Sequence, residues 1–363
     1  MTKTTFPGRV IIHVGDHKAG STSIQSGLTR GDVNLNNGKL CYPLPSGRYG
    51  HNYAAHKFTG SISQRWSPDT APLVKMAKLA RSCSPDLTIF SAEGFEAANP
   101  YKVRRAFERD LLIPADKIDV FCLLRPHNAR LCATLAEHIK CGSASPDPMK
   151  DLNRLRRYWV GYAARCLIWS AAFGDRYRVS PFLRSEMANE NPLSEMFART
   201  IGLDVVTIHA QTHANKSLST EDLMRIHFIQ QGLRDLPKWD RHKIGWSIAR
   251  RFQNDSSLGR TRTPLALDKK TAVSLKRRYW LDATLLDHRY FDGRPLMRDA
   301  LSRSADEAPN VRLALDPEIW LGTEERLKMQ KITLEMRALT KSVGWRQVIR
   351  KQEIESILAH IET

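Results

Sequence analysis

Residues 10–25 read VIIHVGDHKAGSTSIQ, and this stretch decides the fold. Four of its first five residues are apolar and β-branched, which is typical of a strand buried in a parallel sheet. Gly15 and Gly20 bound a short loop, and the hydroxyl residues at positions 21–23 suit the N-terminus of a helix. The stretch therefore predicts a strand, a loop and a helix in succession.

The spacing of the two glycines, G-x-x-x-x-G-x-T, is that of a phosphate-binding loop. In such a loop, backbone N–H groups and the helix N-terminus point into one concavity and favour an anion. A nucleoside-triphosphate loop places lysine directly after the second glycine, where Ser21 stands here. Lys18, two residues before Gly20, can still reach the bridging oxygen of a bound 5′-phosphate, but the usual Mg²⁺ arrangement is missing. The alternative interpretation is a glycine-rich turn without function.

The rest of the chain alternates between strand and helix patterns. We expect strands at 87–91, 118–124 and 177–179. Helices are expected at 75–81, 101–112, 128–140, 158–172, 220–232 and 270–290, and residues 31–72 look irregular. Alternation of this kind predicts an α/β fold of the P-loop type, in which helices flank a mainly parallel sheet in three layers. We expect one such domain over residues 1–300.

Beyond that domain, a helical C-terminal extension is expected over residues 301–363. Residues 324–339 and 345–361 have the pattern of two amphipathic helices. Their apolar stripe either packs on the core or pairs two subunits as a homodimer.

Composition limits the partners. The formal net charge of +18 favours anionic partners such as nucleotides, acidic glycans, nucleic acid or a membrane surface. Because the basic residues are dispersed, a nucleic-acid tail is not expected. The six cysteines form no CxxC pair and the histidines no HExxH motif, so we expect free thiols and no metal. Neither a signal peptide nor a membrane-spanning apolar run is evident, which predicts a cytoplasmic protein that meets its substrate there or at the inner face of the membrane.

Residues 13–25 resemble the 5′-phosphosulfate loop of bacterial-type sulfotransferases, a family that commonly reads H-x-G-x-x-K-x-G-[ST]-[ST]-S-[IL]-Q. The similarity continues in order through Tyr42-Pro43, His51, residues 91–95 (SAEGF) and residues 123–126 (LLRP), with weaker matches at 215–219 and 290–293. The resemblance implies transfer of a sulfuryl group from 3′-phosphoadenosine-5′-phosphosulfate to a hydroxyl or amine. By the same resemblance, the acceptor is a carbohydrate or glycolipid.

The resemblance also implies donor-binding residues. The 5′-phosphosulfate would be held by the loop and the start of the helix, at His17, Lys18, Ala19, Gly20, Ser21, Thr22 and Ser23. Arg125 stands where the family binds the 3′-phosphate, and an arginine at the end of a strand can fork onto a phosphate, although a surface ion pair is the alternative. The family places a serine eight positions later. Here that position is Ala133, so either the neighbouring Thr134 compensates or the hydroxyl is absent.

Transfer to a hydroxyl requires a group that accepts its proton, and a carboxylate or imidazole can do so. Glu93, after the second strand, is our first candidate for this base, and His51, in the irregular segment, is the second. Glu93 would otherwise be a carboxylate that favours the start of a helix.

Two other functions remain open from the sequence. A nucleotide or small-molecule kinase would share the loop but needs a lysine after Gly20 and a carboxylate for Mg²⁺. A non-catalytic protein that binds polyanions would show steeply salt-dependent binding that is insensitive to changes in the loop.

Overall fold

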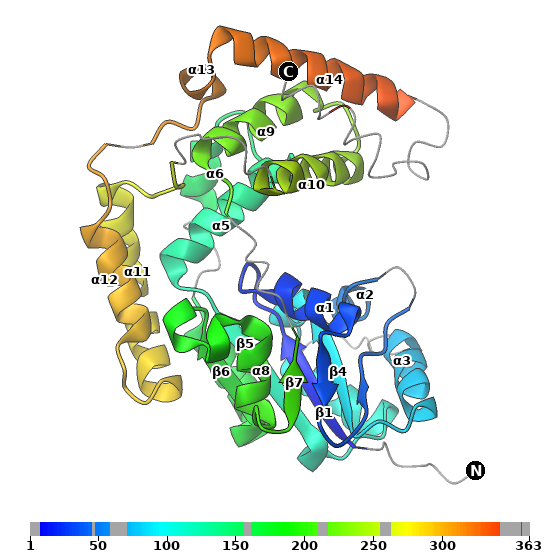
Figure 1. Ribbon diagram of the computed structural model, residues 1–363. Helices are drawn as coiled ribbons and strands as arrows, with labels where there is room; N and C mark the ends of the chain where they lie inside the picture. The colour runs from blue at the N-terminus through cyan, green and yellow to red at the C-terminus, as the bar shows by residue number, and fades with distance from the viewer. Residues whose placement is uncertain are drawn as a thin grey trace. The chain divides into compact units, whose positions relative to one another are not determined.

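The computed structural model describes residues 8–45, 48–58, 71–155, 161–209, 217–254, 263–311, 313–341 and 357. A parallel sheet of five strands forms its centre, in the order β3–β4–β1–β5–β6 (Figure 1). These strands are β1 (Arg9–Val14), β3 (Leu40–Cys41), β4 (Leu87–Ala92), β5 (Ile118–Leu124) and β6 (Tyr177–Pro181). The predicted α/β class with a parallel sheet is confirmed. A second, antiparallel pair joins β2 (Val33–Leu35) to β7 (Val206–Ile208).

Every residue of β4 and β5 is buried, as expected for strands covered on both faces. On one face, Ile11 and Ile89 belong to a core that includes residues of α1 (Ser21–Arg30) and α8 (Pro192–Thr200). On the other face, the ring of Phe90 meets that of Phe107 edge to face, with centroids 5.2 Å apart. Alternate residues of each strand therefore point to opposite faces of the sheet, and helices cover both faces.

The remaining α-helices are α2 (Asn52–Ala55), α3 (Ala71–Ser82), α4 (Pro100–Arg105), α5 (His127–Lys140), α6 (Pro148–Leu155), α7 (Ala163–Phe173), α9 (Thr220–Gly232), α10 (Lys238–Asn254), α11 (Lys269–Tyr290), α12 (Leu296–Asp306), α13 (Pro317–Trp320) and α14 (Thr323–Lys341). A π-helical segment, Ala106–Asp110, continues α4. Short 3-10 helices occupy His56–Phe58, Glu93–Ala97, Ala115–Lys117, Gly174–Arg176, Arg184–Glu186 and Ala188–Glu190. The predicted helix over 345–361 lies outside the described residues except for Ile357.

The chain divides into two compact units at boundaries that differ from the predicted ones. The first contains residues 1–130, 161–212 and 278–301, and the second contains residues 131–160, 213–277 and 302–363. The second unit has its own apolar core, to which α9, α10 and α14 contribute residues such as Ile226, Ile248 and Met336. The C-terminal helix α14 therefore packs within a helical unit to which segments from residue 131 onward also contribute. An amphipathic stripe shows that a face is buried but not what buries it.

No helix among the described segments is both long enough and apolar enough to cross a membrane.

Gly245 provides a test of the packing in the second unit. A Cβ atom added at Gly245 on α10 would lie 1.7 Å from the backbone oxygen of Lys140 at the end of α5. Alanine at a helix position normally gains about 1 kcal/mol over glycine. We expect Gly245→Ala to lower the free energy of unfolding in spite of that gain, by about 1–3 kcal/mol, because two backbones must separate. Urea unfolding measures the change. Gly161→Ala is the control, since its nearest contact would be an ordinary 3.5 Å, and equal stability of both variants would contradict the close packing.

Candidate anion-binding active site

Three neighbouring strands bring the predicted site residues to one edge of the sheet. Val14, the last residue of β1, is in register with Ala92 of β4 and with Cys122 of β5. Glu93 follows β4, the glycine loop follows β1, and Arg125 follows β5. Ligands of parallel α/β sheets bind outside the carboxyl ends of the strands. The loop, the candidate base and the candidate phosphate-binding arginine thus share the edge where such ligands bind.

The loop depends on its two glycines. The Gly15 N–H donates to the carbonyl of Ala92 at 3.0 Å, and a Cβ atom at Gly15 would lie 2.5 Å from the Ser21 hydroxyl oxygen. Gly20 has a φ of 83°, in the left-handed region that favours glycine. Lys18 also has a positive φ, 65°, which is uncommon for a residue with a side chain and is found more often at functional sites.

The N-terminus of α1 carries no side-chain cap. Gly20 is its N-cap residue and accepts from the N–H groups of Ser23 and Ile24, but no side chain accepts a hydrogen bond there. The first N–H groups of a helix have no partner within it, and together with the helix dipole they favour an anion. The local structure is therefore that of an anion site.

The side chains predicted to contact the donor differ in their exposure. Ala19 and Ser21 are buried, so only their backbone can face a ligand, whereas Lys18 and Ser23 are half-buried and Thr22 is exposed. The hydroxyl of Ser21 donates to the backbone carbonyl of Asp16 at 3.5 Å. Ser21 thus faces the inside of the loop.

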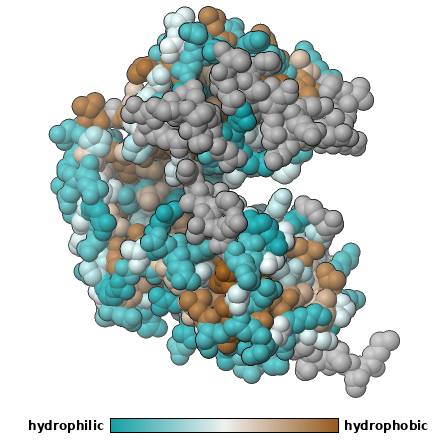
Figure 2. Space-filling model, viewed as in Figure 1, coloured by the Kyte–Doolittle hydropathy of each residue, from teal (hydrophilic) through white to brown (hydrophobic). Residues whose placement is uncertain are grey.

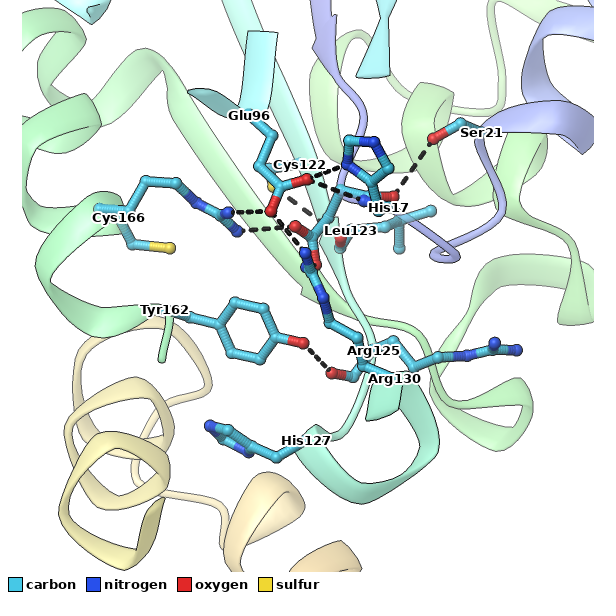
Figure 3. A network of polar contacts seen from close by, with 12 residues as sticks. His17, Ser21, Glu96, Cys122, Leu123, Arg125, His127, Arg130, Tyr162 and Cys166 are labelled. Atoms are coloured by element: carbon cyan, nitrogen blue, oxygen red, sulfur yellow. Dashed lines mark hydrogen bonds and ion pairs between the residues drawn. The ribbon is translucent and has the colours of Figure 1, made fainter. Parts of the chain in front are cut away.

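Arg125 is connected to the loop through an aromatic ring. Its guanidinium carbon lies 5.0 Å from the ring centroid of Phe182, and that ring is 2.7 Å from where a Cβ atom of Gly20 would be. The backbone carbonyl of Arg125 accepts a hydrogen bond of 2.6 Å from the Tyr162 hydroxyl. In Figure 3 the side chain of Arg125 points away from Arg130. Arg125 is therefore held at the side of the loop where α1 begins.

The two candidate bases have different surroundings. Glu93 is half-buried, and its Cα and Cγ atoms would lie 3.1 and 3.2 Å from a Cβ atom on Gly15, so it borders the loop. His51 is completely buried. Its Nδ1 accepts from the Ser91 N–H at 3.0 Å, and its Nε2 lies 3.1 Å from the carbonyl of Pro43, to which it donates in that tautomer. Burial lowers the pKa of His51 to about 4.

These contacts give His51 a structural task. Its ring joins the segment around Pro43 to β4, and both ring nitrogens are engaged by the backbone. A proton acceptor must reach the acceptor hydroxyl through an accessible atom. Of the two candidates, Glu93 is half-buried and His51 is completely buried, so the structure favours Glu93, and the choice of base stays a prediction.

Our sequence analysis did not predict an ion cluster at the loop, which we call the loop ion cluster: Asp16, His17, Glu96, Arg130 and Arg165. Glu96 accepts from Arg130 at 2.6 Å (Figure 3) and from Arg165 at 2.7 Å. Asp16 pairs with Arg165 at 2.9 Å and also with Arg130. Asp16 is 1% exposed and Arg130 7%. A buried charge is costly unless it is paired. Asp16, Glu96, Arg130 and Arg165 therefore depend on one another for their stability as ions.

His17 belongs to this cluster more than to the predicted donor contacts. Its ring Nδ1 bonds to Glu96, and its backbone N–H donates to the same carboxylate at 3.1 Å. The hydrogen bond to Glu96 raises the pKa of His17 despite partial burial. Burial opposes ionisation of Glu96, but His17, Arg165 and Arg130 together hold the pKa of Glu96 well below its usual range. Both the ring and the backbone N–H of His17 thus contact Glu96, and the predicted contact of His17 with a donor stays a prediction.

The cluster gathers residues from four segments of the first unit. Asp16 and His17 lie in the loop after β1, Glu96 in the 3-10 helix after β4, Arg130 in the first turn of α5, and Arg165 in α7. One signal was available in the sequence, since Arg165 is a lone charge in the apolar segment 163–173. Which carboxylates it meets depends on how the helix packs.

Thr134 lies on α5 and is half-buried, but it belongs to the second unit. Its contact with a 3′-phosphate therefore stays a prediction. In the described part of the chain, no group of three or more His, Cys, Asp or Glu side chains is placed to hold a metal ion.

The pH dependence of stability tests the loop ion cluster. Glu96→Gln keeps the side-chain shape and removes one of the two carboxylates that neutralise Arg130 and Arg165. We expect a loss of about 3–5 kcal/mol in the free energy of unfolding at pH 7. Because the folded pKa of Glu96 is depressed, its stabilisation is present above the unfolded value of about 4.3 and is lost as the pH falls below it.

The difference between the wild-type protein and Glu96→Gln should therefore shrink below that pH, as measured by urea unfolding at a series of pH values. Glu108→Gln is the control, because Glu108 forms a surface pair with Arg104, four residues apart on the chain. A difference that stays constant across the whole pH range would show that Glu96 is not held ionised by the cluster.

Comparison of the chain with protein-family models, with curated proteins and with solved structures gave no significant match.

Proposed function

We propose that this protein is a sulfotransferase that moves a sulfuryl group from 3′-phosphoadenosine-5′-phosphosulfate to a hydroxyl or amine of an acceptor, of the carbohydrate or glycolipid class. The observation that carries the proposal is the convergence at the carboxyl ends of β4, β1 and β5. An uncapped helix N-terminus with a displaced lysine, a carboxylate and an arginine meet there. These are the groups that binding and transfer from such a donor require.

In this proposal, the start of α1 and Lys18 bind the 5′-phosphosulfate. An acceptor oxygen attacks the sulfur, the bond from sulfur to the bridging oxygen breaks, and 3′-phosphoadenosine-5′-phosphate leaves. Negative charge develops on the bridging oxygen, and the helix dipole and the Lys18 ammonium stabilise it there. Glu93 takes the proton that the attacking hydroxyl loses. Arg125 binds the 3′-phosphate and so orients the donor.

The loop ion cluster supports this proposal over a kinase. A kinase of the P-loop type needs a hydroxyl and a carboxylate that hold Mg²⁺ beside the phosphates. Here the carboxylate of the loop, Asp16, is occupied by Arg130 and Arg165. Ser21 stands at the position of the lysine that such a loop requires. Transfer of a sulfuryl group, which carries less charge than a γ-phosphoryl group, is compatible with a site that relies on Lys18 and backbone N–H groups.

Arg125→Ala tests whether the site distinguishes a 3′-phosphate. Losing a charge-assisted hydrogen bond to a phosphate costs about 1.5–3 kcal/mol, so affinity for 3′-phosphoadenosine-5′-phosphate should fall by about ten- to a hundredfold. Affinity for adenosine 5′-phosphate should hardly change. Calorimetric titration measures both, with Arg105→Ala as the control because Arg105 is an exposed arginine of the same unit. An equal fall for both nucleotides would assign Arg125 a structural role.

Lys18→Ala tests charge stabilisation in the transition state. Lysine and alanine both carry a Cβ atom, so the substitution does not relieve the backbone strain of the positive φ at this position. We expect turnover to fall by about 10²–10³, the scale for removing one stabilising donor, and donor affinity to fall less. Single-turnover transfer of labelled sulfuryl to a panel of small hydroxyl compounds provides the measurement. Lys78→Ala removes an exposed lysine of α3 as the control. Turnover near that of the wild type would remove Lys18 from the mechanism.

Glu93→Gln tests the base. The amide keeps the shape of the side chain, so nucleotide binding should persist while turnover falls by about 10²–10⁴. His51→Ala should behave differently, because it leaves the Ser91 N–H and the Pro43 carbonyl without their partner. We expect lower thermal stability for that variant but nearly unchanged turnover per folded molecule. The reverse result, an active Glu93→Gln and a folded but inactive His51→Ala, would make His51 the base.

A further inference from the structure

Helix α7 exposes an apolar stripe where a surface helix normally presents polar residues. Leu167 and Ile168 are each 48% exposed. Ala164 and Ala171 are also exposed, and the four positions recur at the i, i+3, i+4, i+7 spacing of one helix face. The opposite face of α7 holds the buried Cys166 and Trp169.

The neighbouring helix α11 continues this surface. Leu281 and Leu285 are 69% and 46% exposed, whereas Ala283 and Leu286 on the other side of the helix are buried. Leu281 and Leu285 are four residues apart and therefore share a face.

Two contacts show that the helices run side by side in the same direction. The carboxylate of Asp282 accepts from the backbone N–H of Ala163 at the start of α7 (2.9 Å). Eight residues further along α11, the hydroxyl of Tyr290 lies 2.8 Å from that of Ser170. With 3.6 residues per turn, the exposed stripe on each helix lies about 100° from the residues that face the other helix. For parallel neighbours this places both stripes on the same side, and we call the combined surface the α7–α11 face.

Among the residues of α7 and of α11 from Arg278 onward, the exposed charged side chains are cationic. Arg278 and Arg289 on α11 are exposed at the ends of the face, and the exposed Asp175 and Asp292 follow α7 and α11. The acidic residues of this part of α11 are turned into the protein. Asp282 caps α7 and contacts His127, and Asp287 is buried and accepts from the N–H of Met297. Helix α7 contains no acidic residue.

Hydrophobic residues scattered singly over a surface are ordinary. On the side of the molecule shown in Figure 2, hydrophobic residues lie among hydrophilic ones. Four large apolar side chains on two adjacent helices, Leu167, Ile168, Leu281 and Leu285, differ from single scattered residues, because contiguous patches mark places of contact with a partner.

We propose that the α7–α11 face docks on the surface of an anionic lipid bilayer. Apolar side chains of this kind insert at the boundary between headgroups and acyl chains, and flanking basic residues are attracted to anionic headgroups. The net charge of +18 adds a long-range attraction to such a surface.

A second copy of this chain fits the face less well than a bilayer does. In a twofold dimer the same patch meets itself, so the cations at its ends would approach the cations of the other copy. An anionic surface instead complements them.

The test is co-sedimentation of the full chain with lipid vesicles. The vesicles contain phosphatidylcholine alone, or phosphatidylcholine with about one third phosphatidylglycerol. We expect binding to the anionic vesicles that weakens with added salt. Leu281→Gln/Leu285→Gln should reduce the partition coefficient at least about tenfold. Leu327→Gln/Leu334→Gln on α14 is the matched control, because both leucines are 61% exposed.

Circular dichroism and urea unfolding confirm that the variants are folded, and the vesicle assay needs no donor, so its result is independent of the proposed function. Equal loss in both double variants, or absence of binding to anionic vesicles by the wild-type chain, would overturn the proposal. Light scattering tests whether a second copy of the chain binds the face. A wild-type dimer that Leu281→Gln/Leu285→Gln converts to a monomer would show that it does and would overturn the proposal.

Discussion

The pairing of Asp16 with Arg130 and Arg165 is the interaction on which the candidate site depends most. A carboxylate that is 1% exposed cannot remain ionised without partners. Two guanidinium groups supply them, and Glu96 shares both. The cluster therefore joins the loop to α5, to α7 and to the 3-10 helix after β4. Without it, the loop would begin with an unpaired buried charge.

This arrangement has an electrostatic consequence for the loop. The acidic charges of Asp16 and Glu96 are balanced inside the protein, so they oppose an anion at the start of α1 less than free carboxylates would. The helix dipole and Lys18 then set the sign of the local field. A site fixed in this way before the ligand arrives loses little energy to rearrangement when charge develops. Lys18 and Gly20 both have a φ in the left-handed region, so the backbone of the loop also adopts a defined conformation.

Local patterns were sufficient for the sheet and for several helices. The strand at 118–124 and the helices at 220–232 and 270–290 agree with the structure within one residue, because burial on both faces and helical period are visible in the sequence. Glu93, Lys18 and Arg125 were found because each follows a recognisable strand. Short elements such as β2, β3 and α2 were not, since they depend on contacts with distant segments.

The division into units and the loop ion cluster could not be predicted for the same reason. Arg165 and Glu96 are far apart in the sequence, and only the packing of α7 on the sheet brings them together. The burial of His51 likewise results from the return of the segment around Pro43 to β4, which no local spacing indicates. Sequence patterns located the edge of the sheet that carries the site, and tertiary contacts decided which of its residues remain available for chemistry.

Calorimetric titration of the wild-type protein with 3′-phosphoadenosine-5′-phosphate and with ATP, each with and without Mg²⁺, tests the central claim most directly. The account predicts that 3′-phosphoadenosine-5′-phosphate binds more tightly than ATP, and that Mg²⁺ leaves its affinity unchanged, because Lys18, α1 and Arg125 supply the contacts. Tighter binding of ATP that requires Mg²⁺ would contradict the account and assign the loop to a kinase.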